Sequence, residues 1–211
     1  MFFFEPYSTS FRILKKNIFL NNIHRISTMF KMAVSNRRQE GYIFVDNINT
    51  GGSEIHTDET AKTFKGIDHS NRRNVYEEPV IIDTVDSVMP KDVKPNFILM
   101  DVQMLELEAL EGMKETLARA TDLIIFCEWS GYSIHLNQTE YIPRMKSLLK
   151  WLEEHQYKSY EIKFQASRTG SCSKHHFSEL SLEEFVKMSN SLHQKRKYTD
   201  VLFVSGHIDP N

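Results

Sequence analysis

Three short apolar runs along the chain each end on a carboxylate. They are residues 2–5 ending on Glu5, residues 97–101 ending on Asp101, and residues 124–128 ending on Glu128. Runs of this length, flanked by helical patterns, indicate buried strands of a parallel sheet. In open α/β sheets the ligand crevice lies outside the carboxyl ends of the strands. We therefore expect the three acids to lie at such a crevice.

The residues after the first run show the spacing of an amphipathic helix. Apolar side chains recur at Phe11, Leu14 and Ile18, and residues 8–10 supply hydroxyl N-cap candidates. The pattern predicts a helix that ends at residues 21–22. Residues 26–35 then indicate the next strand, which ends in a small-residue turn.

Residues 96–128 form the clearest strand–helix–strand unit. After Asp101, a helix is predicted that carries its apolar side chains on one face, at Leu107, Leu110, Met113 (or Lys114) and Leu117. A second strand then runs to Glu128, and base rates favour a right-handed crossover between the two parallel strands.

The remaining segments complete one predicted α/β domain over residues 1–211. Strands are expected at residues 42–45, 80–82, 157–164 and 200–204, a short turn or helix at 85–88, and a helix at 139–155. The polar stretch 47–78 indicates a long surface loop or hairpin insertion. Loops of that length are usually functional or mobile.

The composition excludes some classes of protein but does not identify one. The chain has 211 residues, 40% hydrophobic and 26% charged, with a formal charge of −2. This balance argues against a nucleic-acid binder or a strongly basic membrane-surface protein. Cys127 and Cys172 are too few for a disulfide framework, which favours reduced thiols and a cytoplasmic location. No apolar stretch approaches the length of a membrane span.

Each of the three acids has a functional and a structural interpretation. Glu5 could bind the ribose hydroxyls of a nucleotide-type cofactor, but its position alone favours an acid stabilised by the helix that follows. Asp101 could orient a substrate, act as a general base or bind a metal, or it could cap the next helix. Glu128 could line the crevice or face solvent, and we favour the crevice.

Two further patterns restrict the cofactor chemistry. No G-x-G-x-x-G or Walker sequence occurs in the chain, so no glycine-rich turn for phosphate binding is predicted. Cys172 with His175 and His176 matches no zinc-ligand spacing, and we predict no metal site.

Read together, the segments resemble the FkbM family of S-adenosylmethionine-dependent methyltransferases. The resemblance covers about residues 2–165 and is collinear. It rests on Phe3-Phe4-Glu5-Pro6, Ala33-Val34-Ser35, Asn49-Thr50-Gly51-Gly52-Ser53, Thr84-Val85-Asp86, Asp101-Val102 with Glu106-Leu107-Glu108-Ala109-Leu110 and Gly112, and Ile124-Ile125-Phe126 with Glu128. A local likeness of residues 99–104 to response-regulator receiver domains lacks the proline and the lysine that those domains carry, and we reject it.

The resemblance implies a Rossmann-like sheet, mostly parallel, with an antiparallel C-terminal strand. It implies transfer of a methyl group from S-adenosylmethionine to a hydroxyl of a small molecule or sugar. By this resemblance Glu5 would hold the cofactor ribose, and Asp101 would lie beside the transferred methyl group. Ala33, Val34 and Ser35 would lie near the adenine. Residues 47–78 and 130–140 would build the acceptor pocket.

The chain departs from the family pattern in two places. Gln103 and Met104 stand where the family has Glu-Gly. The first strand and its glycine-rich cofactor turn are not found, so we expect an N-terminally truncated sheet. These departures keep a second hypothesis open, in which the chain is a catalytically inactive remnant or an interaction module. A partner chain would then fill the gap in the sheet.

Overall fold

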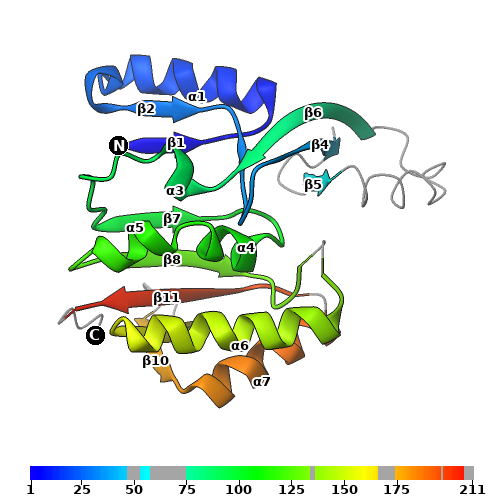
Figure 1. The fold of residues 1–211 in the computed structure, drawn as a ribbon, viewed down its shortest axis with the longest axis vertical. Helices are drawn as coiled ribbons and strands as arrows, with labels where there is room; N and C mark the ends of the chain where they lie inside the picture. Colours follow the sequence, from blue (N-terminus) through cyan, green and yellow to red (C-terminus); the bar gives the residue numbers. More distant parts are fainter. Residues whose placement is uncertain (47–52, 58–74, 134–135, 166–173, 196, 207–211) are drawn as a thin grey trace.

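Three β-sheets and the helices between them make up the structure, a computed structural model that describes residues 1–46, 53–57, 75–133, 136–165, 174–195 and 197–206 (Figure 1). The strand orders are β1-β2, β10-β9-β11-β8-β7 and β3-β6-β4-β5. The α/β fold predicted from the sequence is confirmed. Among the described residues, none of the helices is long and apolar enough to cross a membrane.

The chain begins with a strand, a helix and a parallel strand. These are β1 (Phe2–Phe4), α1 (Ser8–Leu20) and β2 (Thr28–Phe30), with a short 3₁₀ turn at His24–Ile26 before β2. The predicted strand and helix are confirmed, but the N-cap is Tyr7, whose side chain makes no capping hydrogen bond, and not one of residues 8–10. Ser8 instead donates its hydroxyl and its N–H to the carboxylate of Glu78, so it serves a tertiary contact.

The prediction of one strand over residues 26–35 is wrong. β2 pairs with β1, whereas β3 (Ala33–Val34) pairs with β6 (Val75–Asp83) in a different sheet. The chain changes sheet between them at Lys31 and Met32, of which Met32 is 6% exposed. Because β2 and β3 are both apolar, the sequence pattern does not indicate that the chain passes from one sheet to another.

The third sheet contains the described parts of the polar stretch that was predicted to be a long surface loop or hairpin insertion. β4 (Gln39–Asp46) pairs antiparallel with both β6 and β5 (Glu54–Thr57). Residues 47–52 and 58–74, which the loop prediction also covers, lie outside the described residues. The predicted short helix is confirmed as α3 (Val85–Val88), whose N-cap Thr84 accepts a hydrogen bond from the N–H of Ser87.

The central unit runs from β7 (Phe97–Met100) to the parallel strand β8 (Ile124–Trp129). The single predicted helix is two, α4 (Glu106–Glu111) and α5 (Lys114–Arg119), separated at Gly112. A Cβ at Gly112 would lie 1.9 Å from the carbonyl oxygen of Ser35. The break therefore lets the helical segment approach the backbone of another element closely.

The last strands are antiparallel. β11 (Thr199–Ser205) lies between β8 and β9 (Tyr157–Gln165), and β10 (Lys174–Leu180) pairs with β9. Of the eight pairings between described strands, three are parallel and five antiparallel, so the sheets are mixed and the mostly parallel sheet is not confirmed. The predicted antiparallel C-terminal strand and its pairing with residues 157–164 are confirmed.

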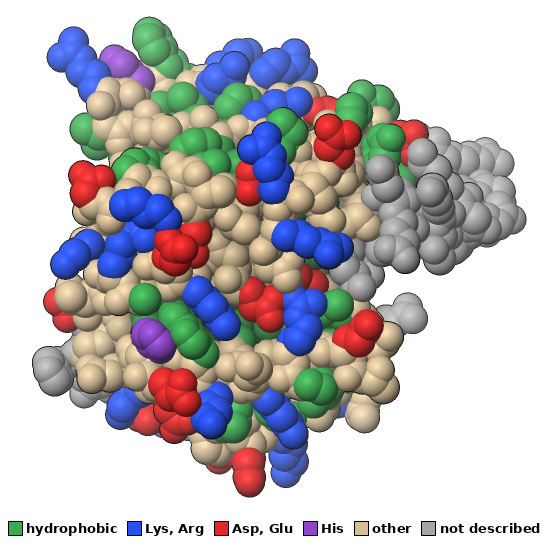
Figure 2. All heavy atoms as spheres, viewed as in Figure 1, with side chains coloured by type: hydrophobic (Ala, Val, Ile, Leu, Met, Phe, Trp, Pro, Cys, Tyr) green, Lys and Arg blue, Asp and Glu red, His purple; other side chains and the backbone are tan. Residues whose placement is uncertain are grey.

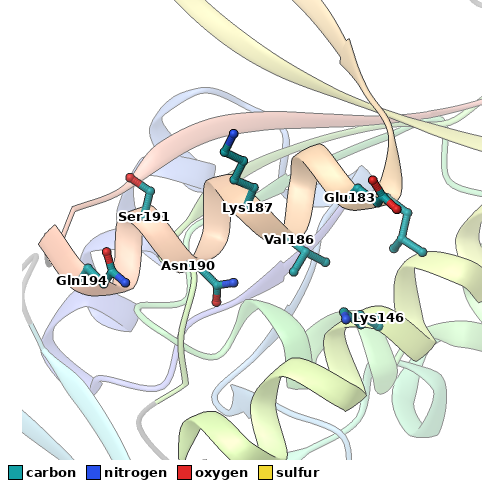
Figure 3. Close-up of a pocket in the computed structure, with 8 residues that line it drawn as sticks. Lys146, Glu183, Val186, Lys187, Asn190, Ser191 and Gln194 are labelled. Carbon is teal, nitrogen blue, oxygen red and sulfur yellow. The ribbon is translucent and has the colours of Figure 1, made fainter.

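Two helices lie side by side near the C-terminal strands. They are α6 (Gln138–Glu154), which begins with a capping box of Asn137 and Glu140, and α7 (Leu182–Lys195). A groove of about 640 Å³ separates them, lined by Lys146 of α6 and by α7 side chains such as Val186 and Asn190 (Figure 3).

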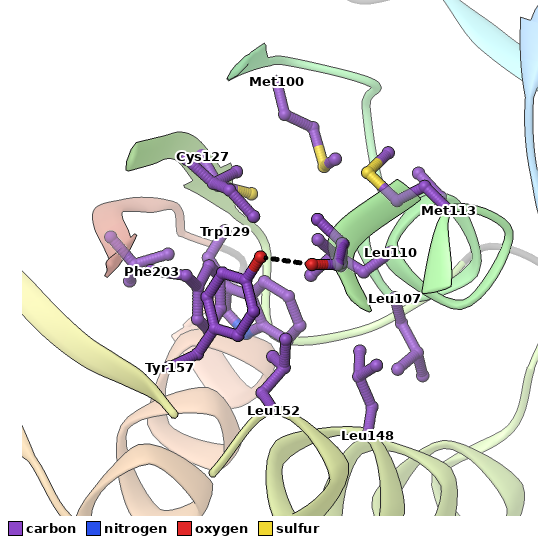
Figure 4. Close-up of a cluster of buried hydrophobic side chains, with 14 of the residues drawn as sticks. Met100, Leu107, Leu110, Met113, Cys127, Trp129, Leu148, Leu152, Tyr157 and Phe203 are labelled. Carbon is purple, nitrogen blue, oxygen red and sulfur yellow. Dashed lines mark hydrogen bonds between the residues drawn. The ribbon is translucent and has the colours of Figure 1, made fainter. Parts of the chain in front are cut away.

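The main core lies between the five-stranded sheet and helices α4, α5 and α6 (Figure 4). Trp129 is fully buried, packs edge-on against Phe185 and donates its indole N–H to Ser189 Oγ at 2.8 Å. Tyr157 donates its hydroxyl to the carbonyl of Leu117 at 2.9 Å. These polar groups are hydrogen-bonded inside the core, as most buried polar groups are.

Two strands of different sheets, β1 and β7, each have one edge that is unpaired within the described part of the chain. There β1 pairs only with β2, and β7 pairs only with β8. Figure 1 shows β1 and β7 running in the same direction with no strand between them. On β7, Phe97 is 58% exposed and Leu99 is 70% exposed. Elsewhere on the face in Figure 2, acidic and basic side chains are interspersed, in keeping with the small net charge.

Candidate functional site

Acidic side chains meet at the carboxyl ends of β7 and β8. Asp101 follows β7 directly, and Glu128 is the fifth residue of β8. Gln103 lies between them and donates its side-chain N–H to Asp101 Oδ1 at 2.6 Å and to Glu128 Oε2 at 3.5 Å. The expectation that Asp101 and Glu128 lie together is therefore met by the geometry, and a single amide links the two carboxylates.

A third acid, Asp200, joins this group from the antiparallel strand β11. Asp200 is the register partner of Glu128. Sequence reasoning missed it because it looked only for acids that end strands, whereas an antiparallel strand brings its beginning to the same edge. The available signal was an acid immediately before the apolar run 201–204.

The acids influence one another electrostatically. Burial, followed by the like charges of Asp101 and Asp200, raises the pKa of Glu128, and the hydrogen bond from Gln103 opposes this rise. Burial and the charge of Asp101 likewise raise the pKa of Asp200. A carboxylate whose pKa is raised binds a proton more readily near neutral pH. The group can thus accept a proton from a bound hydroxyl.

The loop that carries Gln103 has an unusual backbone. Gln103 and Met104 both have positive φ, 48° and 69°. Left-handed backbone costs a non-glycine residue about 1–2 kcal/mol. The strained pair places the Gln103 amide between Asp101 and Glu128, and strain of this kind gathers at functional sites.

Behind the three acids lies a fourth, fully enclosed carboxyl group. Glu106 opens α4 and is 2% exposed. Burial raises its pKa to about 7. Its two oxygens contact the N–H of Met104 and the hydroxyl of Ser130, which follow β7 and β8 respectively. In the sequence Glu106 stands out only as part of a motif, because nothing in the local pattern marks it as buried.

Glu5 lies at the carboxyl end of β1, as predicted. Its Oε1 accepts the N–H of Tyr7 at 2.8 Å, and burial raises its pKa while that hydrogen bond lowers it. This contact matches the interpretation of an acid at the start of α1. Oε2 makes no hydrogen bond with any residue that the structure describes, and so one oxygen is open to a ligand.

The three small residues proposed for the adenine are buried in the structure. Ala33, Val34 and Ser35 are 3%, 8% and 1% exposed, and Ser35 donates its N–H to the carbonyl of Asp83 at 2.9 Å. Among the residues that the structure describes, the hydroxyl of Ser35 has no hydrogen-bond partner. Their side chains pack within the protein, and their part in cofactor binding stays a prediction.

Other expected or visible features lie away from this site. Cys127 is buried as a small hydrophobic residue, as predicted, whereas Cys172 lies outside the described residues. Within the described ranges, no three His, Cys, Asp or Glu side chains are placed to hold a metal ion. The groove between α6 and α7 is lined by none of the acids discussed above.

Comparison with known proteins identifies one family. The family model described as the methyltransferase FkbM domain matches residues 1–159. No curated protein matches the chain. Among solved structures, methyltransferase FkbM from Methylobacillus flagellatus KT, determined at 2.20 Å, is similar with a TM-score of 0.45 and 12% identity. That similarity covers 96% of this chain and 36% of the other, so the chain spans little more than a third of that protein.

Proposed function

The chain belongs to the FkbM methyltransferase family, and from this premise we propose that it acts in S-adenosylmethionine-dependent O-methylation of a small-molecule or sugar hydroxyl. The observation that carries the proposal is the linked pair of acids, Asp101 and Glu128, at the carboxyl ends of β7 and β8. In α/β sheets this is where substrates bind. The chain's cysteine usage favours the cytoplasm as its location.

When bound, S-adenosylmethionine supplies an electrophilic methyl group on a sulfonium ion. Two observations support a fit at its adenosine end. Glu5 has an oxygen without a described partner, which can accept hydrogen bonds from ribose hydroxyls, and the buried Ser35 hydroxyl likewise has no partner in the described part of the chain. An orphaned polar group of this kind is stabilised by a ligand atom that completes its hydrogen bonding.

In this proposal Asp101 and Glu128 prepare the acceptor. The hydroxyl of the acceptor binds beside the Gln103 amide, within reach of both carboxylates. Its proton passes to the carboxylate of Asp101 as its oxygen bonds to the methyl carbon, and the bond from that carbon to sulfur would break in the same step, leaving a neutral thioether. Glu128 orients the hydroxyl, and its own pKa is raised by burial and by the like charges of Asp101 and Asp200. Gln103 fixes both carboxylates, because correct positioning accounts for much of the rate of such transfers.

Methyl transfer from radiolabelled S-adenosylmethionine to a panel of sugars and hydroxylated small molecules tests this proposal. Asp101→Asn should reduce turnover by about 10²- to 10⁴-fold, the usual contribution of a general base. Asp92→Asn, a change at an exposed aspartate outside the site, is the matched control. Equal turnover by both variants would refute the role of Asp101.

The unpaired edges of β1 and β7 favour a second candidate function. We propose as the alternative that the chain is a binding module without catalysis, whose sheet accepts an extended segment of a partner chain as a parallel strand. Unpaired edges with exposed apolar side chains, here Phe97 and Leu99, are sites of strand addition. A parallel strand inserted between β1 and β7 would join β2, β1, β7 and β8 into one parallel, Rossmann-like sheet region.

Light scattering combined with calorimetry separates the two candidates. The binding module predicts self-association or a bound partner, and no heat on addition of S-adenosylmethionine. A monomeric chain that binds S-adenosylmethionine would exclude it. Leu99→Lys, which places a charge on the open edge, should abolish strand addition, whereas Ile13→Lys at the similarly exposed Ile13 of α1 should not.

A further inference from the structure

Glu106 touches both loops that carry the candidate site. Its Oε1 accepts the N–H of Met104 at 2.8 Å, and its Oε2 lies 2.6 Å from the hydroxyl oxygen of Ser130. Met104 is next to Gln103 in the loop after β7, and Ser130 follows Glu128 by two residues in the loop after β8. The buried side chain of Glu106 thus connects the loop after β7 to the loop after β8.

The contact with Met104 stabilises a strained conformation. Gln103 and Met104 are both in the left-handed region, which is unfavourable for residues with a Cβ. The carboxyl group of Glu106 accepts the N–H that this conformation directs inward. Without that acceptor the N–H would be buried and unpaired, which is unfavourable, and the loop would relax.

Counting protons around Ser130 shows which form of Glu106 fits the structure best. The Ser130 hydroxyl oxygen also lies 2.8 Å from the carbonyl oxygen of Tyr132, yet a hydroxyl has one proton to donate. If Glu106 is protonated on Oε2, it donates to Ser130, and Ser130 donates to Tyr132. Both contacts are then satisfied. If Glu106 is ionised, Ser130 must give up one of them.

The surroundings of Glu106 favour the protonated form. Burial raises its pKa to about 7, and none of the hydrogen bonds to it comes from a cationic group. Among the described residues, Cys127 of β8 and Tyr141 of α6 interact electrostatically with Glu106, and an ionised Glu106 helps to raise the pKa of each. Neither supplies a positive charge that would stabilise the carboxylate.

We propose that Glu106 is a positioning residue that joins the loops after β7 and β8 and thereby holds Gln103 between Asp101 and Glu128. This inference rests on the proposed function only for its consequence for turnover. The positioning itself concerns the free protein, and it is measurable without cofactor or acceptor.

Titration of Glu128 by carboxyl-carbon NMR is the direct test. The hydrogen bond from Gln103 lowers the pKa of Glu128. If Glu106→Ala releases Gln103, the proton affinity of Glu128 should rise about threefold, as expected for the loss of one weak hydrogen bond. Glu106→Gln should leave it unchanged, because its amide can accept from Met104 and donate to Ser130 as the protonated acid does.

Three further variants keep the test decisive. Ser130→Ala removes one contact with less risk to folding and should raise the proton affinity of Glu128 in the same direction, whereas Gln103→Ala sets the full size of the effect. Glu108→Gln is the matched control, because Glu108 is an equally buried acid of α4 that accepts from Ser133 instead. If Glu128 titrates alike in the wild type, Glu106→Ala and Ser130→Ala, the positioning role is refuted.

Turnover provides the second readout and separates this inference from the proposed function. Glu106→Ala should lower kcat by about 10²-fold through misplacement of the acids, with a smaller effect on KM, and Glu106→Gln should restore it. If no variant, including the wild type, transfers methyl groups, the proposed function fails while the titration still decides the positioning role. A Glu106→Gln variant as inactive as Glu106→Ala would contradict the inference.

Discussion

The buried carboxyl group of Glu106 should make the stability of the fold depend on pH. In the folded chain its pKa is raised by burial to about 7, from an ordinary value of 4.5. Between these values the folded state holds a proton that the unfolded state has released. The contribution to stability is therefore fully present below pH 4.5 and is lost as the pH rises through 7.

The size of the effect follows from the difference between the two pKa values. The difference is about 2.5 pH units, and each unit corresponds to about 1.36 kcal/mol. The free energy of unfolding should thus fall by about 3 kcal/mol between pH 4 and pH 8 because of Glu106. Glu106→Gln removes the titrating group and keeps a side chain of the same shape, so this part of the pH dependence should disappear.

Urea unfolding of the wild type and of Glu106→Gln at several pH values measures the effect. Glu5, Glu108, Glu128 and Asp200 also have raised pKa values, but they titrate in both proteins and cancel in the difference. Glu183→Gln, on the exposed surface of α7, is the control and should leave the profile unchanged. Parallel profiles for the wild type and Glu106→Gln would refute the account of this group.

Three other predictions concern stability and the open edge. Gly112→Ala should destabilise the fold by about 1–3 kcal/mol, because its Cβ would clash with the carbonyl oxygen of Ser35; thermal unfolding measures this, and an unchanged Tm would contradict the close approach. Asp86→Ala should cost about 1–2 kcal/mol, because the Asp86 carboxylate accepts the N–H and hydroxyl of Thr116 at the start of α5; denaturant unfolding within 0.3 kcal/mol of the wild type would contradict it. Leu99→Lys should change stability by less than about 0.5 kcal/mol, because that side chain is exposed; a large loss in the same assay would show that the edge is covered.

The central strands were predictable because their signals are local. Each of the three apolar runs ends on an acid, Glu5, Asp101 or Glu128, and its length matches a strand. The expectation that all three strands are buried is wrong for β7, because Phe97 and Leu99 are exposed. The change of sheet between Phe30 and Ala33 was not predictable, since both halves are apolar and the choice of neighbour is a tertiary property. The break of the helix at Gly112 also depends on a distant backbone, that of Ser35.

The candidate site was predictable only in part for similar reasons. The meeting of Asp101 and Glu128 follows from a general rule about parallel strands. Asp200 required knowledge that β11 runs antiparallel beside β8. Glu106 lies in a run of alternating acidic and apolar residues that is typical of a solvated helix face, yet both Glu106 and Glu108 are 2% exposed. Their burial comes from the packing of α4 against α6 and β8, which no local pattern encodes.

Calorimetric titration of the chain with S-adenosylmethionine tests the central claim most directly. The account predicts saturable binding of one cofactor per chain, weakened at least tenfold by Glu5→Gln because the ribose loses a charged hydrogen-bond acceptor. Glu183→Gln should bind as the wild type does. Absence of binding heat across temperatures, with the chain folded by circular dichroism, would contradict the claim that this chain acts as a methyltransferase on its own.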